Sequence, residues 1–152
     1  MTDPTLDLDA FCGTWRIVSS TFPMWTRGSR TGPRFTYAWL SPAADGAPRL
    51  ADNVTYEVRG RTRSIKGVDT LRTGATGPEF RWRGSGLLAP LTSIWRVAEL
   101  GAYDTWAVIV FSRSLLTPAE VDVVVRPKAI ADPEVLDAAR ERSRTLGARW
   151  IL

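Results

Sequence analysis

The sequence predicts an all-β fold: an eight-stranded antiparallel up-and-down β-barrel with one C-terminal α-helix packed on it. Apolar and polar residues alternate with a period of two from residue 14 to residue 126, as in half-buried strands. Short turns rich in Gly and Pro interrupt this alternation, which is typical of neighbouring antiparallel strands. After residue 132 the period becomes helical. The 152 residues suffice for a single domain, 1–152, with the barrel at about 13–127.

The expected strands follow one another closely along the chain. They lie at residues 13–22, 34–40, 50–58, 62–71, 80–83, 92–98, 105–112 and 121–126. A loop rich in Gly, Pro and Arg, residues 23–33, separates the first two strands, and the turns at 41–46 and Gly60 mark later hairpins. A two-sheet sandwich stays an alternative, although it usually needs longer crossover connections.

One helix is expected at about residues 133–146. Asp132 suits the N-cap position, Pro133 the first helical position, and Gly147 the residue after the last turn. One helical face carries residues spaced three and four apart, namely Leu136, Ala139, Ser143 and Leu146. This face predicts that the helix packs against the barrel.

The residues that are absent exclude several classes of chemistry. The chain has no histidine and one cysteine, Cys12, which excludes Ser-His-Asp and Cys-His relays and HExxH zinc sites. Neither GxGxxG nor GxxxxGK[ST] occurs. We therefore expect no metal and no cofactor, so that any catalysis would use carboxylates, hydroxyls, arginines or confinement of the substrate.

Charge and hydropathy bear on the partners. Lys and Arg outnumber Asp and Glu by 20 to 16, for a net charge of +4, and Arg61, Arg63, Arg81 and Arg83 flank aromatic residues. Such a pattern can hold RNA or single-stranded DNA, but no recognition motif accompanies it, and we expect outward-facing arginines and no nucleic-acid partner. No apolar run approaches the ~20 residues of a membrane helix. Because residues 1–9 have no export-signal pattern, we expect a cytoplasmic protein. We also expect it to be a monomer or a homodimer.

Three motifs resemble those of the lipocalin (calycin) family, in the order in which that family has them. Gly13-Thr14-Trp15 matches its G-x-W motif at the start of the first strand. Residues 101–108, with Asp104, are similar to the corresponding region of retinol-binding protein, and Arg126 ends the last strand. The resemblance covers nearly the whole chain and suggests a small bacterial-type barrel. It implies that Trp15 and Arg126 meet at the closed end and have a structural role, together with Gly13 and Asp104.

Strand parity and this resemblance predict the residues around a central ligand. Met24 and Trp25 are expected to cover the open end as a lid. The expected ligand-binding residues are Ile17, Ser19, Tyr37, Trp39, Tyr56, Phe80, Trp82, Thr105, Ile109, Phe111 and Val124. The alternative is that these aromatic residues fill a solid core, since eight strands leave room either for packed side chains or for one small ligand.

Two functions remain open from the sequence. The first is binding of one small hydrophobic molecule by burial of apolar surface. The second is a cofactor-independent cyclase or isomerase acting on a polyene or polyketide-like substrate, because some bacterial barrels of this kind are cyclases in natural-product biosynthesis. Its expected catalytic residues are Tyr37, Arg96 and Asp122. Asp122 could instead be solvated at the rim, and Arg96 could face either way.

Overall fold

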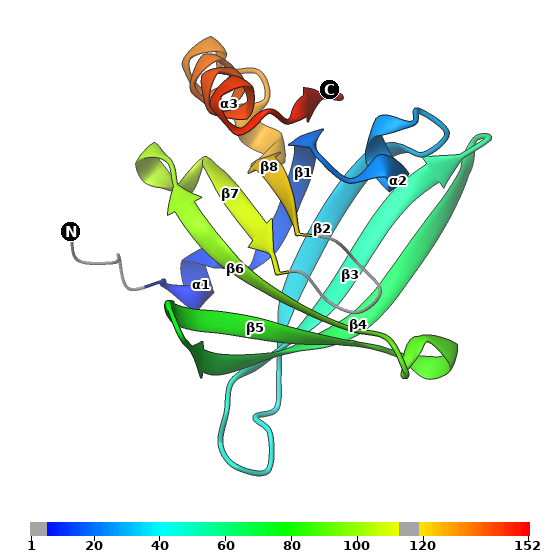
Figure 1. Cartoon of the computed structure of the whole chain (residues 1–152), viewed down its shortest axis with the longest axis vertical. Coiled ribbons are helices and arrows are strands. Elements are labelled where there is room, and N and C mark those ends of the chain that lie inside the picture. Colours follow the sequence, from blue (N-terminus) through cyan, green and yellow to red (C-terminus); the bar gives the residue numbers. More distant parts are fainter. Residues whose placement is uncertain (1–5, 113–118) are drawn as a thin grey trace.

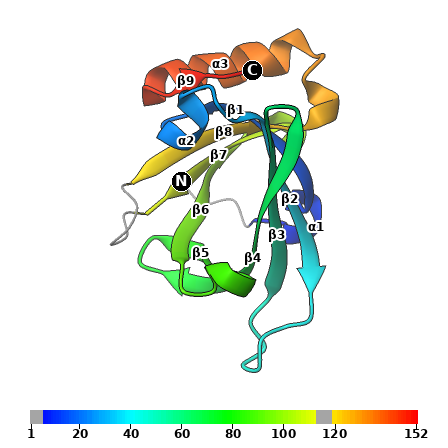
Figure 2. The same ribbon diagram turned by 90° about the vertical axis from the view of Figure 1, so that its right-hand side faces the viewer.

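Eight antiparallel strands close into a barrel in the computed structural model, which describes residues 6–112 and 119–152 (Figures 1 and 2). Each strand pairs with the next along the chain, and β1 pairs with both β2 and β8, which closes the barrel. The strands are β1 (Gly13–Ser20), β2 (Thr31–Leu40), β3 (Arg49–Val58), β4 (Arg61–Gly74), β5 (Gly77–Gly84), β6 (Thr92–Leu100), β7 (Trp106–Phe111) and β8 (Glu120–Val125). The predicted fold class is confirmed.

Several short elements were not expected from the sequence. The predicted loop 23–33 contains the helix α2 (Pro23–Thr26) and the first residues of β2, and α1 (Leu8–Phe11) precedes β1. Three 3-10 turns occur at η1 (Gly86–Leu88), η2 (Ala102–Asp104) and η3 (Pro127–Ala129), and a short strand β9 (Arg149–Trp150) pairs with β1. The helices α1 and α2 lie at opposite ends of the barrel (Figure 2), because β1 crosses its full length between them.

The C-terminal helix α3 (Pro133–Leu146) has the predicted bounds and caps. The Asp132 side chain accepts a hydrogen bond from the Glu134 N–H at 3.0 Å, and Gly147 follows the last turn. Ala139 and Ser143 are buried against the outside of β1 and β8. Figure 1 shows α3 lying outside the barrel. Within the described residues, no helix combines the length and the apolar character that a membrane span requires.

The apolar residues form two cores separated by the barrel wall. The larger one fills the interior and includes Phe11, Trp15, Phe35, Tyr37 and Trp95. The smaller one lies between the wall and α3, where valines of β1, β7 and β8 meet the buried Ala139: Val18, Val108, Val123 and Val125. Strands β1, β7 and β8 are therefore apolar on both faces.

The closed end of the barrel is built around Arg126. Its Cζ lies 3.7 Å from the centroid of the Trp15 ring, and its guanidinium donates to the carbonyls of Ala10, Phe11 and Thr14. Gly13 has φ +103°, and a Cβ there would lie 3.2 Å from Arg126 Nη1. Glycine at this position lets the arginine approach the backbone. The geometry is the one that the family resemblance implied for Gly13, Trp15 and Arg126.

Candidate ligand cavity

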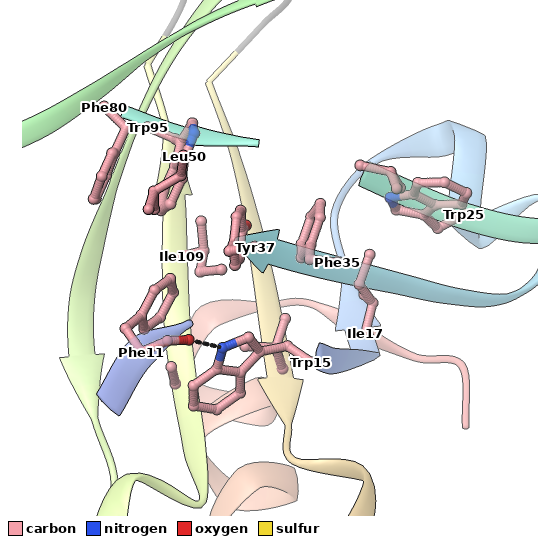
Figure 3. Close-up of a cluster of buried hydrophobic side chains, with 13 residues drawn as sticks. Phe11, Trp15, Ile17, Trp25, Phe35, Tyr37, Leu50, Phe80, Trp95 and Ile109 are labelled. Atoms are coloured by element: carbon pink, nitrogen blue, oxygen red, sulfur yellow. Dashed lines mark hydrogen bonds between the residues drawn. The ribbon is translucent and has the colours of Figure 1, made fainter. Parts of the chain in front are cut away.

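A stack of aromatic rings fills the closed half of the barrel and forms the floor of the candidate site (Figure 3). Tyr37 stacks on Phe11 and on Trp95, with ring centroids 5.3 Å apart in each case, and Trp95 stacks on Phe80 at 4.3 Å. Trp15 donates a hydrogen bond from Nε1 to the Phe11 carbonyl at 2.8 Å, drawn as the dashed line. This half of the interior is packed, as one of the two sequence-based alternatives predicts.

The open half contains a cavity of ≈130 Å³ between this floor and α2. Its walls are mostly apolar and come from seven of the eight strands and from α2. The lining residues are Phe22, Met24, Trp25, Phe35, Asp52, Val54, Ile65, Trp82, Ser93, Trp95, Phe111 and Asp122. The barrel therefore combines a solid core at one end with a small cavity at the other.

The helix α2 covers the cavity and is held by contacts on both sides. Trp25 is buried and meets Tyr56 edge-on, with ring centroids 5.4 Å apart. The guanidinium group of Arg30 lies over the Tyr56 ring, 5.3 Å from its centroid. Phe22, which precedes α2, packs edge-on against Phe111 at 4.9 Å. These contacts place Met24 and Trp25 where the sequence suggested a lid.

A hydrogen-bond chain connects the start of α2 to Asp122 in the cavity wall. The Phe22 N–H donates to Ser20 Oγ at 2.9 Å, and Ser20 Oγ donates to Asp122 Oδ1 at 2.5 Å. Asp122 is fully buried, and its Oδ2 has no hydrogen-bond partner among the described residues. Burial raises the pKa of Asp122 to about 7, although the Ser20 hydrogen bond lowers it, and the charge of Glu120 adds to the rise. The carboxyl group is therefore oriented and half-protonated near neutral pH.

A second acidic group at the cavity is the pair formed by Asp52 and Asp69. Both are buried, and Trp95 Nε1 donates to Asp69 Oδ1 at 2.9 Å. Asp52 Oδ1 and Asp69 Oδ2 have no hydrogen-bond partner among the described residues. Burial, reinforced by the charge of Asp69, raises the pKa of Asp52 well above its usual range. Burial therefore favours the protonated form of Asp52.

The pKa of Asp69 rises less than that of its partner. Burial raises the pKa of Asp69 to about 6, while hydrogen bonds from Asp52 and Trp95 favour its charged form. Nearby, burial followed by the charges of Asp52, Asp69 and Asp122 raises the pKa of Tyr37 well above its usual value. Burial therefore favours the neutral form of the Tyr37 hydroxyl.

Gly67 makes room for one wall of the cavity. It lies on β4 next to Gly84 of β5, and a Cβ at Gly67 would lie 2.1 Å from Trp82 Nε1. The missing side chain lets the Trp82 ring lie across β4. A larger residue at this position would push that ring into the cavity.

Most of the residues expected at the ligand face the interior of the barrel in the structure. Trp82, Phe111 and Asp122 line the cavity, as do the lid residues Met24 and Trp25. Five others face inward but are packed below the cavity or beside its lining: Ile17, Tyr37, Phe80, Ile109 and Val124. Tyr56 contacts Trp25 at the lid. That any of these residues binds a ligand stays a prediction.

Four expected site residues lie elsewhere, and each has a physical reason. A bulge in β1 shifts its pairing with β8 between Ile17 and Ser19, so that Ser19 faces outward and hydrogen-bonds Ser143 of α3. Arg96 pairs with Val110, on the opposite face of β6 from Trp95. The expected inward direction is therefore wrong for Ser19, and Arg96, for which the sequence left both directions open, faces outward.

The other two misplaced residues lie at the closed end, outside the cavity. Trp39 is 48% exposed and donates from Nε1 to Asp9 Oδ1 at 2.7 Å, because β2 extends past the interior core. Thr105 caps the turn η2, and its hydroxyl donates to the Ala102 carbonyl at 2.7 Å. Asp104, in the same turn, has a positive φ of 53°.

The sequence reasoning missed Asp52 and Asp69, which the structure brings together. Val54 and Tyr56 were expected to face inward, and the same parity places Asp52 inward. An acidic residue among apolar inward neighbours was therefore a usable signal. Pairing of Leu50 with Asp69 and of Asp52 with Gly67 brings the two carboxyl groups to diagonal positions on adjacent strands.

Other expected sites can be placed on the same structure. Arg61, Arg63, Arg81 and Arg83 are all exposed, as expected for solvated arginines. Across residues 6–112 and 119–152, no three His, Cys, Asp or Glu side chains cluster as a metal site would require. Cys12 is half-buried, and burial raises the pKa of its thiol, with a further rise from the charge of Asp9.

Comparison with solved structures supports the fold but finds only distant similarity in sequence. The siderocalin Ex-FABP, described as functioning through dual ligand specificities, aligns with a TM-score of 0.61 and 13% identity over 92% of this chain and 89% of its own. Japanin from Rhipicephalus appendiculatus, in a structure bound to cholesterol, aligns with a TM-score of 0.53 and 9% identity over 89% and 88%. No protein-family model matches the sequence, and no curated protein is significantly similar to it. The closed eight-stranded barrel with its C-terminal helix has the lipocalin, or calycin, fold.

Proposed function

We propose that this barrel binds one small, mostly apolar molecule in the cavity beneath α2. The observation that carries the proposal is the cavity beneath α2, with walls mostly of Phe, Trp, Val, Ile and Met side chains. A concave, mostly apolar site with a few polar groups is typical of small-molecule binding. The similarity in fold to japanin, whose structure contains cholesterol, agrees with an apolar ligand.

The volume of the cavity limits the size of that molecule. A cavity of ≈130 Å³ is close to the engineered apolar cavity of about 150 Å³ that binds benzene. Drug-sized ligands occupy roughly 300–1,000 Å³. A ligand of about six to nine non-hydrogen atoms is the size that this cavity accepts, whereas a sterol or a long polyene needs α2 to move outward.

Titration with toluene tests this proposal. Trp25, Trp82 and Trp95 line the cavity, so toluene should change tryptophan emission and saturate at one molecule per chain. Ile65→Phe extends a lining residue into the cavity and should weaken binding at least about tenfold. Ile94→Phe makes the same change on the outward face of β6, opposite Arg81, and should leave the affinity unchanged. The same toluene affinity in both variants would exclude this cavity as the binding site.

A second candidate function is a proton-transfer isomerase or cyclase in the same cavity. The observation that favours it is Asp122, a buried carboxyl group with a pKa of about 7 at the wall of an apolar cavity. Such a group can take a proton from one atom of a bound molecule and return it to another, without a co-reactant. Arg96 has no part in this proposal because it faces away from the interior.

Turnover distinguishes catalysis from binding. If the second candidate is correct, substoichiometric protein should convert a small unsaturated substrate into a single stereoisomer. Asp122→Asn should then lower kcat more than it raises KM, since the carboxyl group acts mainly in the transition state. A ligand recovered chemically intact from the native host protein would count against catalysis and leave the binding proposal in place.

A further inference from the structure

The charges of this protein are distributed unevenly between its interior and its surface. The chain has 20 Lys and Arg side chains and a net charge of +4. Nevertheless, the buried charged residues among the described positions are all acidic: Asp52, Asp69 and Asp122. Two of the three line the cavity, and no described Lys or Arg lines it. Burying a carboxylate without a nearby cation is energetically unfavourable. No described cation at the cavity stabilises the two carboxyl groups that line it.

Asp122 lines the cavity and has one carboxyl oxygen without a hydrogen-bond partner among the described residues. Ser20 Oγ accepts from the Phe22 N–H and donates to Asp122 Oδ1. This hydrogen-bond chain orients the carboxyl group and leaves Oδ2 buried and unpartnered among the described residues. Asp52 and Asp69 form a separate acidic pair in which each affects the pKa of the other.

We propose that the cavity accepts a small primary amine in its protonated form, with the ammonium group on Asp122 Oδ2 and the apolar body against the aromatic walls. This inference rests on the proposed binding function and adds the chemical class of the ligand. An ammonium group has three hydrogen-bond donors and one positive charge. It would donate a hydrogen bond to Asp122 Oδ2 and bring its positive charge close to Asp52 and Asp69. Aromatic faces such as Trp95 and Trp82 add favourable contacts with a cation.

A neutral ligand would bring no positive charge to the buried carboxyl groups. An alcohol or hydrocarbon of equal size fills the cavity but supplies no charge to the carboxylate. A carboxylic acid or phosphate adds a second negative charge beside three acidic groups and is disfavoured. The charge of Glu120, which contributes to the raised pKa of Asp122, further disfavours an anion.

Benzylamine, benzyl alcohol and toluene form a matched set of probes for this site, since they share one ring and differ in the polar group. We expect benzylamine to bind at pH 7.5 at least about tenfold more tightly than toluene or benzyl alcohol, the gain expected for a charge-assisted hydrogen bond. Asp122→Asn, which keeps the shape of the side chain, should remove the preference for benzylamine over toluene. Asp137→Asn changes the same charge on the exposed face of α3 and should keep the preference. Calorimetry or tryptophan emission measures all nine affinities.

The outcomes separate this inference from the proposal on which it rests. If toluene or benzyl alcohol binds as tightly as benzylamine, or if Asp122→Asn leaves the benzylamine affinity unchanged, the amine inference is wrong and the apolar cavity stands. If no probe binds to the native protein, both proposals fail together. A cooperative thermal unfolding transition shows that Asp122→Asn is folded.

Discussion

Asp122 combines two properties that rarely occur together on one side chain. It is fully buried in an otherwise apolar wall, and one of its oxygens has no partner among the described residues. Burial disfavours the carboxylate, which is why its pKa is about 7 instead of near its ordinary value of about 4. Most buried polar groups are hydrogen-bonded, so the unpartnered Oδ2 of Asp122 is an exception at the cavity wall.

This raised pKa predicts how stability depends on pH. The folded state keeps the Asp122 proton up to about pH 7, whereas the unfolded chain loses it near about pH 4. Between these values the folded state binds more protons, so the free energy of unfolding should fall by roughly 1 kcal/mol per pH unit for this group. The protein should therefore melt at a higher temperature at pH 5 than at pH 8. The raised pKa of Asp69, about 6, acts in the same direction.

Two Asp-to-Asn variants isolate the contribution of Asp122 to this profile. Asp122→Asn should flatten the dependence of the melting temperature on pH between 5 and 8, and Asp137→Asn, on the exposed face of α3, should not. A native profile that is flat or rises over this range would contradict the raised pKa values.

At the level of elements, the β1 bulge and the helix α3 depend on each other. The bulge directs both Val18 and Ser19 to the outside, where Val18 joins the core under α3 and Ser19 hydrogen-bonds Ser143. It also restores the inward direction at Ser20, whose hydroxyl reaches Asp122. One extra residue in the strand therefore serves the helix on one side and the cavity on the other.

The tight packing under α3 can be tested with two neighbouring alanines. Ala139 is fully buried, and Ala138 is exposed on the same helix. Leucine has nearly the helix propensity of alanine, so burial alone should decide the result. Ala139→Leu should lower the free energy of unfolding by about 1–3 kcal/mol through overpacking, and Ala138→Leu should change it by less than about 0.5 kcal/mol. Urea denaturation measures both, and equal effects would mean that α3 does not pack as described.

On the scale of the whole molecule, the two ends of the barrel have different roles. Arg126 joins the last strand to the segment before β1 through three carbonyls, those of Ala10, Phe11 and Thr14, and through the Trp15 ring. The aromatic stack of Phe11, Tyr37 and Trp95 (Figure 3) begins beside Trp15, the ring that Arg126 contacts, and Trp95 lines the cavity. The closed end of the barrel therefore stabilises the fold, and the proposed ligand site lies at the opposite end.

This separation predicts the effect of removing Arg126. Arg126→Ala should lower the free energy of unfolding by roughly 1–3 kcal/mol, since the indole contact is lost and carbonyls lose their donors. The toluene affinity should stay unchanged. Arg140→Ala is the matched control because Arg140 also lies over an indole, 4.2 Å from the Trp150 centroid, but on the exposed face of α3. It should cost less stability. A change in ligand preference in Arg126→Ala would contradict the structural assignment of this residue.

Local patterns in the sequence determined much of this protein. Period-two alternation predicted the strands, and the short turns between them predicted an antiparallel order. Asp132, Pro133 and Gly147 predicted the bounds of α3, because caps act within a few residues of the chain. The resemblance of the motifs with Trp15 and Arg126 to those of the lipocalin family implied their contact at the closed end, which the structure contains.

The tertiary structure alone decided which residues meet at the cavity. Parity counting fails at the bulge after Ile17, since one extra residue reverses every later side chain in that strand, and this is why Ser19 was misplaced. It fails again at the strand ends, where Trp39 and Thr105 have the inward parity but lie beyond the core. The hydrogen bond from Ser20 that orients Asp122 depends on the register between β1 and β8, which are distant in the sequence. No local pattern encodes that register, because it results from how the whole barrel closes.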